Sequence, residues 1–215
     1  MKIILFVLAL AATAAATLGD GYKGAGVLWR APERAKPFVL RAYASATDPK
    51  ARLAYAKTLG LWGDGTGSKD LAATFKRSPR DVGIAKALGR GHGPEAKSAL
   101  MAVLESISAS SGLNGVRAVC NGLEELGDPA AAELLAAKLK LPGICGHDCP
   151  TVKSVPPMGG YGVSSDVDRS LVELSFARAL LACGYWKGEG RAVYERYSRD
   201  ARGFLAEHAA RILNK

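Results

Sequence analysis

A short phrase recurs along this chain: a leucine-rich stretch ends at Gly-Asp or a close variant, and a new stretch begins. The copies are LGLWGD at 59–64, LGRGH at 88–92, LEELGD at 123–128 and LLACGY at 180–185, with a shorter LGD at 18–20. Glycine closes an α-helix in the left-handed conformation and aspartate caps the next helix, so each copy predicts a turn between antiparallel helices. Helix pairs repeated along a chain stack side by side. The sequence therefore predicts an all-α fold, an α–α superhelix or solenoid.

Capping signals place the starts of the expected helices. Asp48-Pro49, Ser78-Pro79 and Asp128-Pro129 each join a capping side chain to a proline, which the first helical turn tolerates. We also expect Gly93-Pro94 to open a long helix and Asn114 to cap the next one. The helix after Asn114 has the clearest apolar face of period 3.6. Its members are Val116, Val119, Cys120, Leu123 and Leu126.

The spacing of the turns changes in the C-terminal half. Gly63, Gly91 and Gly127 are 28 and 36 residues apart, whereas Gly184 follows 57 residues later. The extra length is a proline- and glycine-rich loop at 141–166, and a loop this long in a compact domain is often functional. After it we expect helices at 168–182, 190–197 and 202–213.

The first sixteen residues have the pattern of a cleaved secretory signal. Lys2 is followed by an apolar run at 3–12 and by three alanines at 14–16. We therefore expect residues 1–16 to be a signal peptide, and the protein to be secreted or periplasmic. The alternative, a first helix of the solenoid, stays open because Gly19-Asp20 follows directly. No later apolar run reaches the roughly 20 residues of a membrane span.

The chain has a formal net charge of +9, and the charge is uneven. The segment 30–90 holds 13 Lys or Arg against five Asp or Glu, a local excess of +8. Such an excess attracts polyanions, whether nucleic acid, an anionic glycan or a membrane surface, although it is also compatible with a solvated face that only maintains solubility. Nucleic acid is an improbable partner if the protein is exported.

Two segments resemble the HEAT-like repeats of phycobiliprotein lyases (the PBS-lyase type): DPKARLAYAKTLGLWGD at 48–64 and NGVRAVCNGLEELGDPAAAELL at 114–135. A still closer resemblance is to the HEAT-like accessory region attached to bacterial FAD-dependent oxidoreductases. In that region a similar turn precedes a segment like YSRDARGFLAEHAARIL at 197–213. The resemblance extends from about Leu18 to the C-terminus.

This resemblance implies a HEAT-like or armadillo-type solenoid over 17–215, with no catalytic or cofactor-binding residue to carry over. Arg52 and Arg117 match the arginine of the Val-Arg step, which implies structural hydrogen bonds between repeats. No GxGxxG motif follows an expected strand, so oxidoreductase activity is not transferred. The resemblance suggests two alternatives: an accessory module of a FAD-dependent oxidoreductase system, or a chromophore-lyase-like protein that binds a bilin.

The most reactive-looking cluster is CGHDC at 145–149, inside the long loop. A structural zinc site needs four ligands, and no second Cys/His pair lies nearby, so we expect no metal. We favour a disulfide between Cys145 and Cys149, which suits an exported protein, over free thiols. No nucleophile and base can be paired from the sequence, so we expect no catalytic residues. Cys120 and Cys183 lie on apolar faces and are predicted to be core residues.

Aromatic and arginine side chains mix near the C-terminus, as in many binding surfaces. They also suit the terminal unit of a stack, where aromatics fill the gaps between repeats. The candidate binding surface consists of Tyr185, Trp186, Arg191, Tyr194 and Arg199.

Taken together, the sequence predicts a non-catalytic, monomeric helical-repeat scaffold without a cofactor. Its expected role is to present a basic surface to a protein partner or an anionic polymer. DNA binding through the basic half is a further alternative, which export would exclude.

Overall fold

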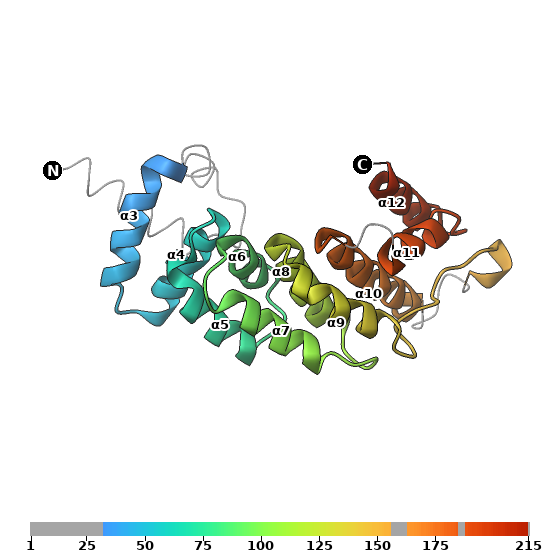
Figure 1. Cartoon of the computed structure of the whole chain (residues 1–215), viewed down its shortest axis with the longest axis horizontal. Helices are drawn as coiled ribbons and strands as arrows, with labels where there is room; N and C mark the ends of the chain where they lie inside the picture. Colours follow the sequence, from blue (N-terminus) through green and yellow to red (C-terminus); the bar gives the residue numbers. More distant parts are fainter. Residues whose placement is uncertain (1–31, 156–162, 185–187, 215) are drawn as a thin grey trace.

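The computed structural model describes residues 32–155, 163–184 and 188–214, and within them the chain is all-helical and has no strand (Figure 1). Three short 3-10 turns, at Gly65–Gly67, Pro129–Ala131 and Val152–Ser154, accompany the helices. The α-helices are α3 (Pro32–Ser45), α4 (Pro49–Leu61), α5 (Ser68–Arg77), α6 (Val82–Gly91), α7 (Ala96–Ser106), α8 (Leu113–Leu126), α9 (Ala132–Leu139), α10 (Val163–Ala182), α11 (Glu189–Tyr197) and α12 (Gly203–Leu213).

The helices form two layers along the length of the molecule. Helices α4, α6, α8 and α10 lie side by side in one layer, each in contact with the next. Helices α5, α7 and α9 follow one another in the second layer, along the lower edge of Figure 1. Helix α3 flanks α4 at one end, and α11 packs on α10 and carries α12 at the other. Successive helices of the repeated part thus alternate between the layers.

The predicted ends of helices at Gly63, Gly127 and Gly184 are confirmed. Each of these glycines follows the end of a helix and has a positive φ, of 77°, 62° and 89° respectively. The turn after α6 differs, because the helix continues through Gly91 and His92 takes the left-handed conformation with a φ of 48°. A positive φ is uncommon outside glycine, although histidine is among the residues enriched there.

Two of the predicted helix starts are confirmed. Asp48 caps α4 and accepts hydrogen bonds from the backbone nitrogens of Lys50 and Ala51, at 3.3 and 3.0 Å. Asp128 accepts from the backbone nitrogen of Ala130 at 2.8 Å, in the 3-10 turn that leads into α9. In both cases proline follows the capping aspartate, where its missing N–H costs no helical hydrogen bond.

The other two predicted caps are wrong. Helix α6 begins at Val82, not at Ser78-Pro79, because Asp81 supplies the cap and accepts from the backbone nitrogen of Ile84 at 3.0 Å. Helix α8 begins at Leu113, one residue before Asn114. Its N-cap is Gly112, which has no side chain to make a capping hydrogen bond.

The apolar core runs between the layers and continues to the C-terminal helices. Leucines at corresponding places, Leu59 in α4, Leu88 in α6, Leu123 in α8 and Leu180 in α10, are all fully buried. The apolar face predicted after Asn114 is confirmed as buried, apart from the half-buried Leu126. Among the described residues, no helix has the combination of length and apolar character that crossing a bilayer requires.

The expected long loop is shorter than 141–166, because α10 already begins at Val163, five residues before the predicted Asp168. Residues 156–162 of that loop lie outside the described residues. So do the predicted signal peptide at 1–16 and the LGD turn at 18–20. The final helices, predicted at 190–197 and 202–213, each differ by one residue at the start.

Candidate functional site

The basic segment predicted from the sequence covers helices α3 to α6 and the turns between them. Three of its five carboxylates form ion pairs with neighbouring cations. The pairs are Lys36–Asp64 at 3.1 Å, Arg52–Asp70 at 2.7 Å and Lys57–Asp81 at 3.5 Å.

The remaining cations of this segment form no ion pair within the described residues, Arg30 lying outside them. Their charges are therefore not compensated by a neighbouring side chain. These nine residues are Arg34, Arg41, Lys50, Lys69, Lys76, Arg77, Arg80, Lys86 and Arg90. The predicted excess of positive charge thus survives folding as free cations.

Arg52 is tied into a structural network between three helices. Its Nε donates to Asp70 of α5 at 2.7 Å, and its guanidinium lies 4.3 Å from the centre of the Tyr43 ring of α3. The Tyr43 hydroxyl also donates to Asp70, at 2.8 Å. Partial burial would raise the pKa of Asp70, but the hydrogen bonds from Tyr43 and Arg52 outweigh it and lower that pKa. Arg52 therefore holds α3, α4 and α5 together, in line with the role that the resemblance implies.

A cleft of about 320 Å³ lies beside this network, between α4 and α5. Lys50 and Arg77 line it together with Arg52 and Asp70. The charge of Arg52 is matched by that of Asp70, whereas Lys50 and Arg77 have no carboxylate partner. The cleft therefore has an uncompensated positive charge on two adjacent helices, which suits an anionic group.

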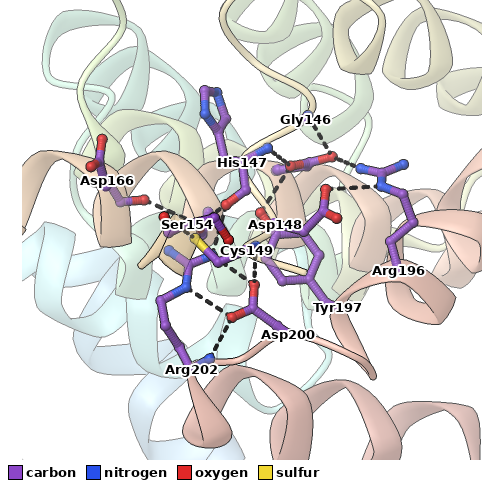
Figure 2. A network of polar contacts seen from close by, with 12 residues as sticks. Gly146, His147, Asp148, Cys149, Ser154, Asp166, Arg196, Tyr197, Asp200 and Arg202 are labelled. Atoms are coloured by element: carbon purple, nitrogen blue, oxygen red, sulfur yellow. Dashed lines mark hydrogen bonds and ion pairs between the residues drawn. The ribbon is translucent and has the colours of Figure 1, made fainter. Parts of the chain in front are cut away.

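In the C-terminal half, a fully buried carboxylate, that of Glu173 in α10, anchors the loop that contains CGHDC at 145–149. It accepts hydrogen bonds from the backbone nitrogens of Gly146 and His147, at 3.2 and 3.1 Å. It also accepts from the Tyr197 hydroxyl at 2.9 Å and forms an ion pair with Arg196 (Figure 2). A buried charge is tolerated when it is paired and hydrogen-bonded in this way.

A second buried carboxylate, Asp200, holds the next part of the same loop. It accepts from the backbone nitrogen of Cys149 at 2.9 Å and pairs with the buried Arg202 at 2.7 Å (Figure 2). Arg202 in turn donates to the carbonyl oxygen of His147 at 2.7 Å. Burial would raise the pKa of Asp200, but the hydrogen bonds from Arg202 and from the backbone nitrogen of Cys149 outweigh it and lower that pKa. We call Glu173, Arg196, Tyr197, Asp200 and Arg202 the clasp.

Within this loop the residues considered for chemistry have structural partners. His147 Nε2 lies 3.0 Å from the carbonyl oxygen of Gly143, and Asp148 pairs with Arg196 at 3.1 Å. The imidazole and the Asp148 carboxylate therefore bond to different groups. Across the described residues, no three His, Cys, Asp or Glu side chains are grouped so that they would hold a metal ion.

All four cysteines are free thiols in the structure. Cys145 is exposed, whereas Cys149 is buried and its thiol donates to the carbonyl oxygen of Ser154 at 3.4 Å. The disulfide expected between them stays a prediction. Cys120 and Cys183 are buried, as predicted. Burial raises the pKa of Cys183 to about 11, and it raises the pKa of Cys120 further still. Neither thiol is therefore poised for nucleophilic chemistry.

Of the five residues of the candidate binding surface near the C-terminus, the structure describes three, and these differ in exposure. Tyr185 and Trp186 lie outside the described residues. Tyr194 is fully buried and donates to the carbonyl oxygen of Leu174 at 3.2 Å, which makes it a core residue. Arg191 is exposed and pairs with Glu195 at 2.8 Å, and Arg199 is exposed.

Sequence reasoning missed the two carboxylates of the clasp. Glu173 stands within a largely apolar stretch, LVELSFARALL at 171–181, and an acid on a buried helix face predicts a specific partner. Asp200 lies between two arginines in SRDAR at 198–202, which gave no comparable signal. The partners on the loop are mainly backbone nitrogens, and no side-chain pattern reveals those.

Comparison of the chain with protein-family models, with curated proteins and with solved structures finds no match. The likeness to HEAT-like repeats therefore rests on the residues quoted above and on the order of the helices.

Proposed function

We propose that the protein is a HEAT-like helical-repeat scaffold that binds an anionic partner, either an acidic protein or an anionic polymer, through its basic half. In this proposal the helix pairs form a superhelix and the chain acts by recognition and not by catalysis. The alternation of α4 to α10 between two layers supports the superhelix, because each helix contacts mainly its neighbours in the stack.

The observation that carries the proposal is the set of nine uncompensated cations in α3 to α6, two of which line the cleft between α4 and α5. Cations held on a preformed helical framework lose little freedom when a partner binds. They also release counterions when they meet a polyanion, so the affinity falls as salt is added. Export through the predicted signal would place such a partner outside the cytoplasm.

Binding of labelled heparin and of poly-L-glutamate to the full chain tests this function. We expect both polymers to bind, and the affinity for each to fall steeply between low and physiological salt. Replacing both free cations of the cleft, Lys50→Glu with Arg77→Glu, is expected to weaken binding by about tenfold or more and to reduce the salt dependence.

The matched control is the pair Arg169→Glu and Arg199→Glu, which makes the same change of net charge at exposed arginines far along the chain. We expect this control to bind nearly as well as the parent protein. Equal weakening by the two double variants would show that only net charge matters, and would contradict a localised surface. Binding that does not respond to salt would contradict the proposal altogether.

A further inference from the structure

A second cavity, in the other half of the molecule, lies between helices α8, α10, α11 and α12. Its volume is about 230 Å³, below the roughly 300–1,000 Å³ of sites for drug-sized ligands, so it suits a small molecule. Part of the cavity lining is apolar and includes Leu171 and Leu174 of α10 and the aromatic ring of Tyr194 of α11. Polar side chains complete its lining.

The polar lining contains one cation without a partner. The Arg117 guanidinium of α8 makes no hydrogen bond or ion pair to any described residue, unlike that of Arg52. The other arginine of the cavity, Arg178, is neutralised by Glu124, with Nε donating at 2.8 Å. The cavity therefore has a net charge close to +1, and the resemblance-based structural role of Arg117 is not fulfilled by any bond here.

His208 of α12 forms the remaining wall, and its ring centre is 6.2 Å from that of Tyr194. Partial burial lowers the pKa of His208, and the positive charges of Arg178 on α10 and Arg211 on its own helix lower it further. Glu124 and Arg117 of α8 are the other charged groups of the cavity. A neutral imidazole offers both a donor and an acceptor to a bound molecule.

From this geometry we infer that the cavity binds a small monocarboxylate that carries an apolar or aromatic group. The carboxylate pairs with the planar guanidinium of Arg117, which suits two parallel hydrogen bonds. The apolar group lies over Leu171, Leu174 and Tyr194. The single uncompensated positive charge of the cavity balances the charge of a monoanion. A phosphate dianion would add a second negative charge that no cation balances, close to the Glu124 carboxylate.

The test is an NMR titration of the full chain with phenylacetate, observed at the His208 imidazole. We expect phenylacetate to shift the His208 signals and to raise the pKa of His208, because a bound anion opposes the field of Arg178 and Arg211. Phenylacetamide, which has the same shape without charge, and inorganic phosphate are each expected to bind at least about tenfold more weakly.

Arg117→Gln is the decisive variant, and Arg169→Gln, an exposed arginine of α10 outside the cavity lining, is its control. We expect the Arg117 variant to lose about tenfold or more in phenylacetate affinity and the control to keep it. Equal binding of phenylacetate and phenylacetamide, unchanged affinity in Arg117→Gln, tighter binding of phosphate, or no response of His208 would each overturn the inference.

This inference does not depend on the basic surface of α3 to α6. Arg117→Gln leaves every residue of that surface in place, so its binding to heparin is expected to stay unchanged. Failure of phenylacetate binding and failure of heparin binding are therefore separate results.

Discussion

At the scale of single residues, glycines set how closely the helices of the first layer approach. A Cβ added at Gly60 of α4 would clash with the backbone carbonyl of Ala87 in α6. One added at Gly122 of α8 would lie 2.9 Å from the carbonyl oxygen of Ala85. Gly60 and Gly89 both belong to the recurring phrases that mark the turns, and both lie inside helices. Chain reversal and close packing both select glycine, so sequence alone did not separate the two roles.

Gly60→Ala is therefore expected to destabilise the protein, although alanine is the better helix former. The added methyl group meets backbone, which cannot rotate away, so we expect a loss of about 1–3 kcal/mol in unfolding free energy. Chemical denaturation measures this change. Gly203→Ala in α12 is the control, because nothing lies within 4 Å of its added Cβ, and it should leave stability equal or higher. An equal loss in both variants would contradict the packing argument.

A second prediction at this scale concerns Asp200 and how the free energy of unfolding depends on pH. Because folding lowers the pKa of Asp200, its contribution is present above the unfolded value near 3.8 and is lost as pH falls through the lower folded value. Asp200→Asn should cost about 1.5–3 kcal/mol at neutral pH. Denaturation measured at several acidic pH values should show the difference from the parent shrinking below pH 4. A difference that stays constant down to the acid transition would contradict the assignment.

At the scale of elements, helix starts were predictable where an aspartate directly precedes a proline. Asp48 and Asp128 both do so, and both predictions are confirmed. Ser78 competed with Asp81 three residues later, and the aspartate supplies the hydrogen bond. Asn114 is not the cap of α8. Gly112, in an extended conformation, occupies the N-cap position, and no side chain caps the helix. The polar clasp was out of reach, because its two carboxylates lie 26 residues or more along the chain from the loop backbone nitrogens that donate to them.

Glu173→Gln tests whether the clasp holds this element together. The amide keeps the size of the side chain but loses the charge that faces Arg196 and two backbone nitrogens. We expect a loss of about 1.5–3 kcal/mol, because hydrogen bonds to a charged group are replaced by weaker ones to a neutral amide. Hydrogen exchange should also accelerate at residues 143–149 before it does in α4. Unchanged exchange in that loop would show that the carboxylate does not anchor it.

At the scale of the whole molecule, the sequence predicted the order of the helices better than it predicted a ligand. The Gly-Asp turns predicted antiparallel pairs, and the described residues contain helices alternating between two layers. The uneven charge predicted a basic half, and its cations are largely unpaired. The cavity at Arg117 brings together α8, α10, α11 and α12, which no local pattern relates.

Because contacts are mainly between neighbouring helices, local stability should vary along the stack. Helix α8 has α6 and α10 on its two sides in the layer, and α7 also packs on it, whereas α12 packs chiefly on α11. We therefore expect backbone amides of α8 to exchange far more slowly than those of α12, in hydrogen exchange followed by mass spectrometry. Equal protection in the two helices would indicate a single cooperative unit.

The clasp also bears on the order of events during synthesis. A ribosome releases residues 143–149 well before Glu173 and Asp200, whose carboxylates accept their backbone hydrogen bonds. The nascent chain therefore carries this stretch without those hydrogen bonds until Glu173 and Asp200 have been translated and α10 and α11 can pack.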